Sequence, residues 1–537
     1  MRIALCQINP ILGDFENNQR KILKFYNRSL ELNPDIIVFP EMAISGYPPQ
    51  DLLWENGFID ANLSCLKNIA ESTSLPIIIG YIREIDNKIF NSAGVCYNGQ
   101  LHSNVDKILL PTYDVFDEDR YFTSGKDPQV VSIPILGKKR TIGIQICEDL
   151  WDHDYECKVS RLQKDIGAEI IINISASPYY EGRLLERKSI IQEKVKETGL
   201  PILYCNMVGG QDELIFDGES LIFNKDAECI GQGKAFEEDI LFVDLNVNKK
   251  IKIQISLPEE KLYNALCLGV EDYFKKSGHK EALIGLSGGI DSALTAVIAS
   301  DALGNKNVHG VSLPSKYSSN HSIDDAQKLA ENLNIDYRII PIQDTVDELE
   351  KALQPYFLDT DSDVTEENIQ ARIRGNILMA LSNKFGWMVL STGNKTELAL
   401  GYCTLYGDMS GGLSVISDLS KKDVYSLSKW LNSNKSDRIP INSINKEPSA
   451  ELAPNQVDPF DYNIVSPLVD AIIENRKSLT EIIREGVNMD LIKELYHKIK
   501  LNEYKRRQAA IGLKVSSKAF GIGRRMPIIN SFKGEIK

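Results

Sequence analysis

The sequence predicts an α/β protein with two domains in succession. The chain has 537 residues, which is more than one hydrophobic core usually organises. In both halves, short β-rich runs alternate with amphipathic segments of helical period, a pattern typical of sheets covered by helices. A polar, lysine-bearing stretch at 246–253 separates the halves. We expect one domain at residues 1–246, a linker at 247–258 and a second domain at 259–537.

The strands predicted in the first half are short and rich in isoleucine and valine. The apolar part of residues 1–7 is too short for a signal peptide and predicts the first strand. Similar β-rich runs recur with amphipathic helices between them, as expected for an α/β domain. These runs lie at 36–39, 77–79, 141–144, 170–172 and 240–245.

The second half shows a stricter alternation of strand and helix. Pro258, followed by two glutamates, marks the start of a helix. The alternation beyond it predicts a parallel sheet covered by helices. Residues 442–463 are rich in Pro, Asn and Asp and are expected to form a mobile loop. The expected strands are 282–286, 308–313 and 337–342; one expected helix ends at 303 and another spans 322–333.

Composition narrows the functional classes. The chain is 43% hydrophobic and 25% charged, as is usual for a soluble globular protein, and it has no apolar run long enough to span a bilayer. Its nine cysteines include no Cys-x-x-Cys pair, which argues against a disulfide framework or a structural zinc site and fits a reducing cytoplasm. A net charge of −14 disfavours nonspecific binding to nucleic acid. We expect a cytoplasmic protein with neither membrane nor nucleic-acid partners.

The segment 284–293 carries the strongest chemical signal in the chain. Its apolar run leads into Ser287-Gly288-Gly289, and apolar residues then continue at helical spacing. This order predicts a strand, a tight glycine turn and a helix N-terminus, which together suit a phosphate group. No Gly-Lys-Ser/Thr follows, so the segment is not a Walker loop. A bare Ser-Gly-Gly turn would merely join strand to helix, but the full string Ser-Gly-Gly-Ile-Asp-Ser favours a pyrophosphate site.

Three reactive side chains of the first half lie at or just beyond predicted strand ends: Glu41, Lys107 and Cys147. Together they suit acyl transfer, in which the thiolate attacks a carbon, the glutamate takes the proton and the lysine stabilises the oxyanion. A lysine also lowers the pKa of a neighbouring thiol. Taken alone, a cysteine on an apolar strand is more often an inert core residue.

The contexts of these three residues resemble the nitrilase superfamily in order and sequence. The matching strings are Pro40-Glu41, Lys107-x-x-Leu-Pro and Ile146-Cys-Glu-Asp. This resemblance implies an αββα sandwich in which Glu41 is the general base, Lys107 the oxyanion partner and Cys147 the nucleophile.

The same resemblance implies a pocket for an amide substrate. Glu118 matches an acidic residue often found near the family's triad, although a solvated acidic loop is an equal alternative. Ser175 and Ser177 lie in a stretch that looks like the family's substrate-binding segment, although small residues there can simply permit packing. Tyr113 and Arg183 complete the residues expected to bind the substrate, glutamine.

A second polar cluster follows the glycine turn, between residues 366 and 425. Asn368 and Arg372 share a helical face through their i, i+4 spacing. Arg372 could grip phosphate or carboxylate, although a solvated arginine is the commoner case. The stretch 390–397 ends a strand and begins a helix, which suits a ligand at the sheet edge. There Glu397, with Asp291, would supply two hard oxygens for Mg²⁺.

Several strings of this half resemble the NAD synthetases. They are Ser-Gly-Gly-Ile-Asp-Ser, Pro-Ser-Lys-Tyr-Ser-Ser, Asn-Ile-Gln-Ala-Arg-Ile-Arg, Thr-Gly-Asn-Lys-Thr-Glu and Leu-Tyr-Gly-Asp. Residues 446–452 fit the loop that closes over ATP, and 503–508 and 519–528 look like the tail of the glutamine-dependent branch. The resemblance implies a doubly wound parallel sheet of the ATP-pyrophosphatase type, similar to the adenine nucleotide alpha hydrolases.

The resemblance implies a ligand for several residues of this half. Mg²⁺ would lie on Asp291 and Glu397. The choice of Lys421 as a ligand depends on the register of the match, because another lysine follows it. The residues implied for ATP are Gly285, Ser287, Gly288, Gly289, Asp291, Ser292, Ser312, Pro314, Thr392 and Ser449, and those for deamido-NAD are Asn368, Arg372, Glu397, Asp408 and Lys421.

The implied reaction divides between the halves. The first would release ammonia from glutamine, and the second would adenylate deamido-NAD with ATP and use the ammonia to form NAD⁺. Ammonia must travel unprotonated, so we expect a sheltered passage. The resemblance also implies a homo-oligomer, at least a dimer through the second domain. Two alternatives stay open: another ATP-pyrophosphatase amidotransferase, or a nitrilase-type amidase whose second domain senses nucleotides.

Overall fold

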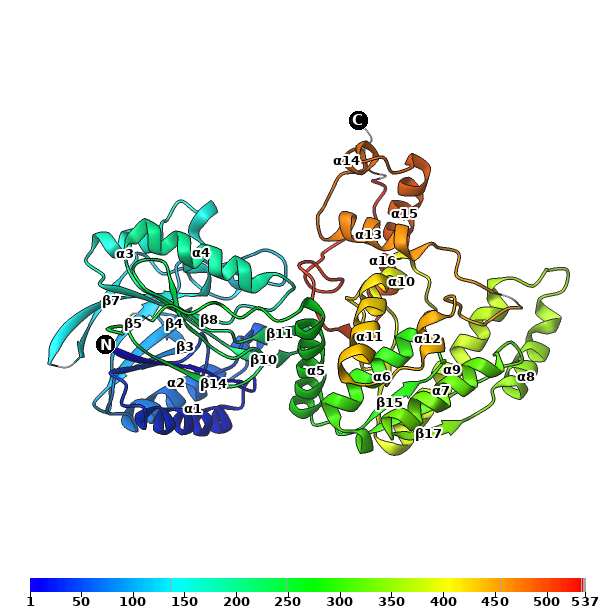
Figure 1. Ribbon diagram of the computed structural model, residues 1–537, viewed down its shortest axis with the longest axis horizontal. Helices are drawn as coiled ribbons and strands as arrows, with labels where there is room; N and C mark the ends of the chain where they lie inside the picture. The colour runs from blue at the N-terminus through cyan, green and yellow to red at the C-terminus, as the bar shows by residue number, and fades with distance from the viewer. Residues whose placement is uncertain (136, 248, 455, 533, 535–537) are drawn as a thin grey trace. The chain divides into compact units, whose positions relative to one another are not determined.

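The computed structural model describes residues 1–135, 137–247, 249–454, 456–532 and 534. By its internal contacts the chain divides into two compact units, Met1–Ser256 and Leu257–Lys537 (Figure 1). The linker expected at 247–258 includes residue 248, which lies outside the described residues, so the domain boundaries stay a prediction. The described residues include no helix with the length and apolarity needed to cross a membrane.

Two sheets packed face to face form the centre of the first unit. In its described residues each sheet has six strands, in the orders β14-β1-β2-β3-β4-β5 and β13-β12-β9-β8-β7-β6. Inward-facing residues such as Ile78 and Ile172 form the core between them. The strands are β1 Arg2–Gln7, β2 Ile36–Val38, β3 Ile77–Ile85, β4 Lys88–Tyr97, β5 Gln100–Asp106, β6 Val130–Ile135, β7 Lys138–Ile146, β8 Ile170–Ser175, β9 Ile202–Asn206, β12 Leu221–Phe223, β13 Cys229–Gln232 and β14 Asp239–Asp244; β10 Val208–Gln211 and β11 Leu214–Asp217 form a separate hairpin.

Helices cover the outer face of each sheet. The helices α1 (Phe15–Leu30) and α2 (Phe58–Glu71) pack on the sheet that contains β1. The helix α4 (Arg183–Thr198) packs on the other sheet, where α3 (Val159–Asp165) also contacts β7. This arrangement is the predicted αββα sandwich. The carboxyl ends of β2, β7 and β8 open toward the loops that carry the candidate catalytic residues.

A single parallel sheet organises the second unit. Its order is β17-β16-β15-β18-β19-β20 over the residues described, and every neighbouring pair is parallel. The chain starts in the middle of the sheet, at β15, builds outward to one edge and then returns to build toward the other. Parallel strands joined in this way need crossover helices. The strands are β15 Ala282–Gly285, β16 Val308–Ser312, β17 Asp336–Ile339, β18 Met388–Ser391, β19 Leu413–Ser414 and β20 Ile511–Gly512.

Helices lie on both faces of this sheet. Leu283 points toward α8 and α9, where it joins a core with Val346 and Ile373. Its strand neighbours Ala282 and Ile284 point the other way and are also fully buried; α6 contacts β15 and β16. The unit is therefore doubly wound, as predicted. Its helices are α5 Pro258–Ser277, α6 Ile290–Leu303, α7 Asn320–Leu333, α8 Gln343–Leu353, α9 Val364–Phe385, α10 Lys395–Leu400, α11 Lys421–Lys435, α12 Ile441–Asn445, α13 Tyr462–Ile473, α14 Leu479–Arg484, α15 Met489–Leu501 and α16 Glu503–Arg506.

Most predicted element limits agree with the structure to within two or three residues. Pro258 is the first residue of α5, and α6 ends at Leu303 as expected. The stretch 442–463 is irregular only in part, because α12 ends at Asn445 and α13 begins at Tyr462. Residue 455 of this stretch lies outside the described residues.

Candidate active sites

A buried lysine between two carboxylates forms the centre of the site in the first unit. Lys107 Nζ lies 2.8 Å from Glu41 Oε1 and 2.8 Å from Glu118 Oε1, and all three residues are buried. Burial alone would lower the pKa of Lys107, but the two carboxylates raise it well above its ordinary value. The lysine is therefore a fixed positive charge. The burial of Glu118 excludes the solvated-loop alternative.

Hydrogen bonds fix the orientation of both carboxylates. Glu41 Oε1 also accepts from Asn91 Nδ2 at 2.7 Å, and Oε2 accepts from the backbone N–H of Ala176 at 2.7 Å. Glu118 accepts from the hydroxyl of Tyr47 at 2.8 Å. Burial raises the pKa of Glu118, and Lys107 opposes this shift. A carboxylate with both oxygens engaged in this way suits a base that must hold one position.

Cys147 follows β7 directly and adopts an unusual backbone conformation. Its φ of 44° lies in the left-handed region, which is costly for a residue other than glycine. Asn173 Nδ2 donates to its carbonyl at 3.2 Å. Burial raises the pKa of the Cys147 thiol well above its ordinary value, Glu41 raises it further and Lys107 lowers it. Burial and Glu41 therefore favour the protonated thiol, whose reaction needs a neighbouring base.

The other predicted residues of this unit make hydrogen bonds and ring contacts with its polar and aromatic groups. The Tyr113 hydroxyl donates to the carboxylate of Glu148 at 3.0 Å. Arg183 donates through Nε and Nη2 to Ser177 Oγ, at 3.3 Å each, and its guanidinium lies 4.1 Å from the centre of the Trp151 ring. Ser177 and Arg183 thus form one polar group.

Ser175 is engaged in a different interaction. Its hydroxyl donates to Asn173 Oδ1 at 2.6 Å, and Asn173 in turn holds the carbonyl of Cys147. This geometry favours a supporting role for Ser175, and its direct contact with glutamine stays a prediction.

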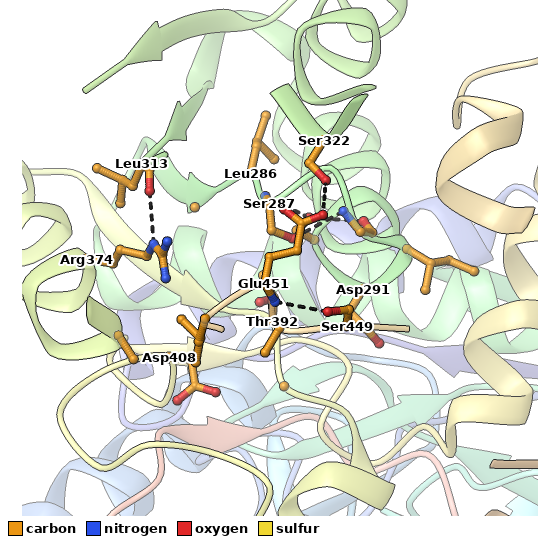
Figure 2. Close-up of a pocket in the computed structure, with 18 of the residues that line it drawn as sticks. Leu286, Ser287, Asp291, Leu313, Ser322, Arg374, Thr392, Asp408, Ser449 and Glu451 are labelled. Carbon is orange, nitrogen blue, oxygen red and sulfur yellow. Dashed lines mark hydrogen bonds between the residues drawn. The ribbon is translucent and has the colours of Figure 1, made fainter. Parts of the chain in front are cut away.

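A pocket of about 290 Å³ lies at the carboxyl ends of β15, β16 and β18 (Figure 2). This volume is near the lower end of the range found for ligand sites. Ligands of doubly wound sheets bind at this edge, where the strand order reverses. The predicted residues that line it are Gly285, Ser287, Gly289, Asp291, Ser292, Ser312, Pro314, Thr392, Glu397, Asp408, Lys421 and Ser449.

The turn before α6 depends on Gly288. Its φ is +74°, and a Cβ at this position would lie 2.2 Å from the carbonyl oxygen of Ser322. Only glycine therefore lets the turn approach α7 so closely. Gly288 does not line the pocket; it shapes the turn whose neighbours do.

Lys421 lies between the two carboxylates predicted to hold a metal. Its Nζ is 2.5 Å from Asp291 Oδ2 and 3.2 Å from Glu397 Oε1. Burial opposes the charged form of Lys421, but the carboxylates raise its pKa. Burial raises the pKa of Glu397 to about 7, with Lys421 opposing the shift. The pair thus attracts a cation, and two carboxylates beside a phosphate site are what Mg²⁺ commonly uses.

Asn368 and Arg372 share a helical face, as predicted, but this face does not line the pocket. Thr404 Oγ1 donates to Asn368 Oδ1 at 2.7 Å, and Arg372 Nε donates to the carbonyl of Leu405 at 3.2 Å. Their binding roles stay a prediction.

Arg374 lines the pocket and was missed from the sequence. Its Nε donates to the carbonyl of Leu313 at 2.9 Å, with the rest of the guanidinium turned toward the cavity (Figure 2). Burial lowers the pKa of Arg374 to about 10, while Glu451 and Asp408 oppose this. Residues two apart on a helix point about 200° apart, so choosing the Arg372 face excluded this arginine. The second arginine in the Ala-Arg-Ile-Arg string was the available signal.

The segment 446–452 borders the same pocket. Glu451 accepts from Ser322 Oγ at 2.6 Å (Figure 2). It also accepts from Ser319 Oγ at 3.0 Å. Lys446 Nζ donates to Ser322 Oγ at 3.0 Å. These contacts hold the segment against the N-terminal turn of α7. Neither side chain was assigned a role from the sequence.

Comparison with known proteins identifies the family. A carbon-nitrogen hydrolase model matches residues 2–252, and an NAD synthase model matches residues 262–509. Proteins described as glutamine-dependent NAD(+) synthetases in Thermotoga maritima and Synechocystis are each 41% identical to this chain, with 99% of both sequences covered. The chain belongs to the glutamine-dependent NAD(+) synthetases. An Acinetobacter baumannii member of this family, solved in complex with ADP, is 36% identical, with a TM-score of 0.79 over 98% of both chains.

For this NAD(+) synthetase chain, we expect Gly288→Ala to lower the local stability around α6 and α7 by about 1–3 kcal/mol, since it adds left-handed strain to a backbone clash. Hydrogen exchange of the two helices measures the effect. Gly393→Ala is the matched control, because it lines the same pocket and its added Cβ meets nothing within 4 Å. Equal protection in both variants would contradict the prediction.

We expect Lys107→Met to destabilise the first unit by about 3–5 kcal/mol, because it leaves two buried carboxylates without their cation. Hydrogen exchange of β4 and β5 measures local stability here. The double variant Lys107→Met/Glu118→Gln removes one of the stranded charges and should recover part of the loss. If Glu118→Gln instead adds to the loss, the carboxylates do not depend on Lys107 as described.

Proposed function

We propose that this chain forms NAD⁺ from deamido-NAD, ATP and glutamine. The observation that carries the proposal is the presence, in one chain of this family, of two chemically different sites. One has a cysteine that interacts electrostatically with a Lys–Glu pair, and the other has a glycine turn and two carboxylates at a sheet edge. The first suits hydrolysis of an amide, and the second suits transfer of an adenylyl group from ATP.

In the first site, Cys147 attacks the side-chain amide carbon of glutamine. The thiol proton passes to Glu41 and then to the leaving nitrogen, the C–N bond breaks and a γ-glutamyl thioester remains. Water, deprotonated by Glu41, hydrolyses the thioester and releases glutamate. Lys107 supplies the fixed positive charge that favours the oxyanion. Ser177 and Arg183 form a polar group suited to the amino-acid end of glutamine.

In the second site, the nicotinate carboxylate of deamido-NAD attacks the α-phosphorus of ATP. Pyrophosphate leaves, and its charge is met by the turn at 287–289 and by the N-terminus of α6. Arg374, which reaches the same cavity, suits a phosphate because its guanidinium is a rigid fork. Ammonia then attacks the carbonyl carbon of the adenylate, AMP leaves and NAD⁺ forms.

Asp291 and Glu397 would hold Mg²⁺ in this site. Bound there, the ion supplies positive charge that offsets the phosphates of ATP. Lys421 already bridges the two carboxylates, so we propose that its ammonium balances them when no nucleotide is present. A homo-oligomer and a cytoplasmic location stay predictions.

The main test is the Cys147→Ala variant, assayed for NAD⁺ with ATP, Mg²⁺ and deamido-NAD. We expect it to lose NAD⁺ formation from glutamine and to keep wild-type formation from ammonium, because only the first site needs the thiol. The wild-type chain should use both nitrogen sources. If it makes glutamate but no NAD⁺ from either source, the acceptor is not deamido-NAD.

We expect Asp291→Asn to raise the Mg²⁺ concentration needed for AMP formation roughly 10-fold or more, because even outer partners of a metal site are worth that much. A titration of Mg²⁺ at saturating ATP and ammonium measures the shift. Asp301→Asn, on the same helix and bonded to Arg438 outside the pocket, should leave the requirement unchanged. An unshifted titration in Asp291→Asn would remove this residue from the metal site.

A further inference from the structure

The carboxylate of Asp149 joins two backbone segments of the first unit. Its Oδ1 accepts from the N–H of Ile108 at 3.0 Å and from the N–H of Leu109 at 2.9 Å. Its Oδ2 accepts from the N–H of Ile146 at 3.0 Å. Asp149 is 1% exposed, and no ion pair joins it to a cation in the described part of the chain. Three backbone donors therefore satisfy this buried charge.

These donors are the chain neighbours of two residues that react. Ile108 and Leu109 directly follow Lys107, and Ile146 directly precedes Cys147. Cys147 has a φ of 44°, and such a conformation persists only where the surroundings determine it. Asn173 holds the carbonyl side of Cys147, and Asp149 holds the N–H just before it. The same carboxylate thus fixes the backbone of both Lys107 and Cys147.

We propose that Asp149 is a positioning residue that sets the distance between Cys147 Sγ and Lys107 Nζ. This inference rests on the proposed glutamine hydrolysis, in which the lysine must meet the oxyanion that forms when the thiolate attacks. Asp149 itself reaches neither substrate nor the reacting atoms through any of these bonds; it acts through the two backbone segments.

The bonding pattern requires two oxygens that both accept hydrogen bonds. An amide of the same shape has one accepting oxygen, and its NH₂ group would face a backbone N–H, so at least one of the three bonds would be lost. Burial raises the pKa of Asp149 to about 7, and the backbone donors oppose that shift. Asp149→Asn therefore removes the clamp while changing the volume of the side chain very little.

Asp152, in the turn that follows, provides a matched control. It is 0% exposed, and its carboxylate lies 2.5 Å from Lys194 Nζ on α4. It bonds to neither of the two clamped segments, which contain Lys107 and Cys147. Asp152→Asn therefore disturbs a buried charge of the same unit without touching the clamp.

The test is the single-turnover rate constant for glutamine hydrolysis, with enzyme in saturating excess, a quantity that does not depend on the fraction of molecules that fold. A misplacement of about 1 Å costs about 100-fold in rate, and we expect a loss of that order in Asp149→Asn. The rate constant of Asp152→Asn should stay within about threefold of the wild-type value, a far smaller change than the 100-fold loss expected for a misplaced group. NAD⁺ formation from ammonium should be unchanged in both variants. A rate constant in Asp149→Asn no lower than in Asp152→Asn would overturn the proposal.

Alkylation of Cys147 by iodoacetamide separates this inference from the proposed function. Because burial and Glu41 raise the pKa of the thiol and Lys107 lowers it, displacing the Cys147 and Lys107 segments should change the alkylation rate constant in Asp149→Asn but not in Asp152→Asn. If wild-type chain releases no glutamate from glutamine, the proposed function is wrong, and alkylation still decides the clamp. Equal alkylation rate constants in Asp149→Asn and wild type overturn it.

Discussion

Both sites depend on the same interaction, a buried lysine bridging two carboxylates. Lys107 joins Glu41 and Glu118 in the first unit, and Lys421 joins Asp291 and Glu397 in the second. Removing charges from water is costly unless they are paired. In each group burial raises the pKa of one carboxyl group, and the carboxylates raise the pKa of the lysine. Each site therefore holds its carboxyl groups around a fixed cation, and the surrounding polypeptide must be rigid enough to keep that geometry.

The two folds supply this rigidity in related ways. In each unit, parallel strands end together at one edge, so residues distant in sequence meet there. In the first unit Cys147 follows β7 directly, and the Asp149 clamp ties its loop to the segment after β5. In the second, the turn at Gly288 brings α6 against α7, beside the carboxylate pair. Buried strands fix the positions, and short loops present the reactive groups.

The reactive residues could be proposed from the sequence because each lies in a local pattern. Glu41, Lys107 and Cys147 stand at strand ends in strings that resemble the nitrilase superfamily, and the glycine turn joins a strand to a helix. Their catalytic roles stay predictions. Arg374 was missed because helical spacing favoured the Arg372 face, and only packing shows which face meets the pocket. Asp149 could not be found because its three partners are backbone groups, two of them forty residues or more away. Likewise, nothing local indicates that Lys421 lies between Asp291 and Glu397, since these residues come together only when the sheet forms.

In the proposed reaction, nitrogen released at the first site becomes the carboxamide nitrogen made at the second. The most direct measurement supplies glutamine labelled with ¹⁵N in its side-chain amide, together with ATP, Mg²⁺ and deamido-NAD and without added ammonium, and determines the mass of the NAD⁺ formed. We expect NAD⁺ carrying one ¹⁵N atom, with AMP formed in equal amount. Labelled ammonia released into solution, with AMP absent and no label in NAD⁺, would contradict it.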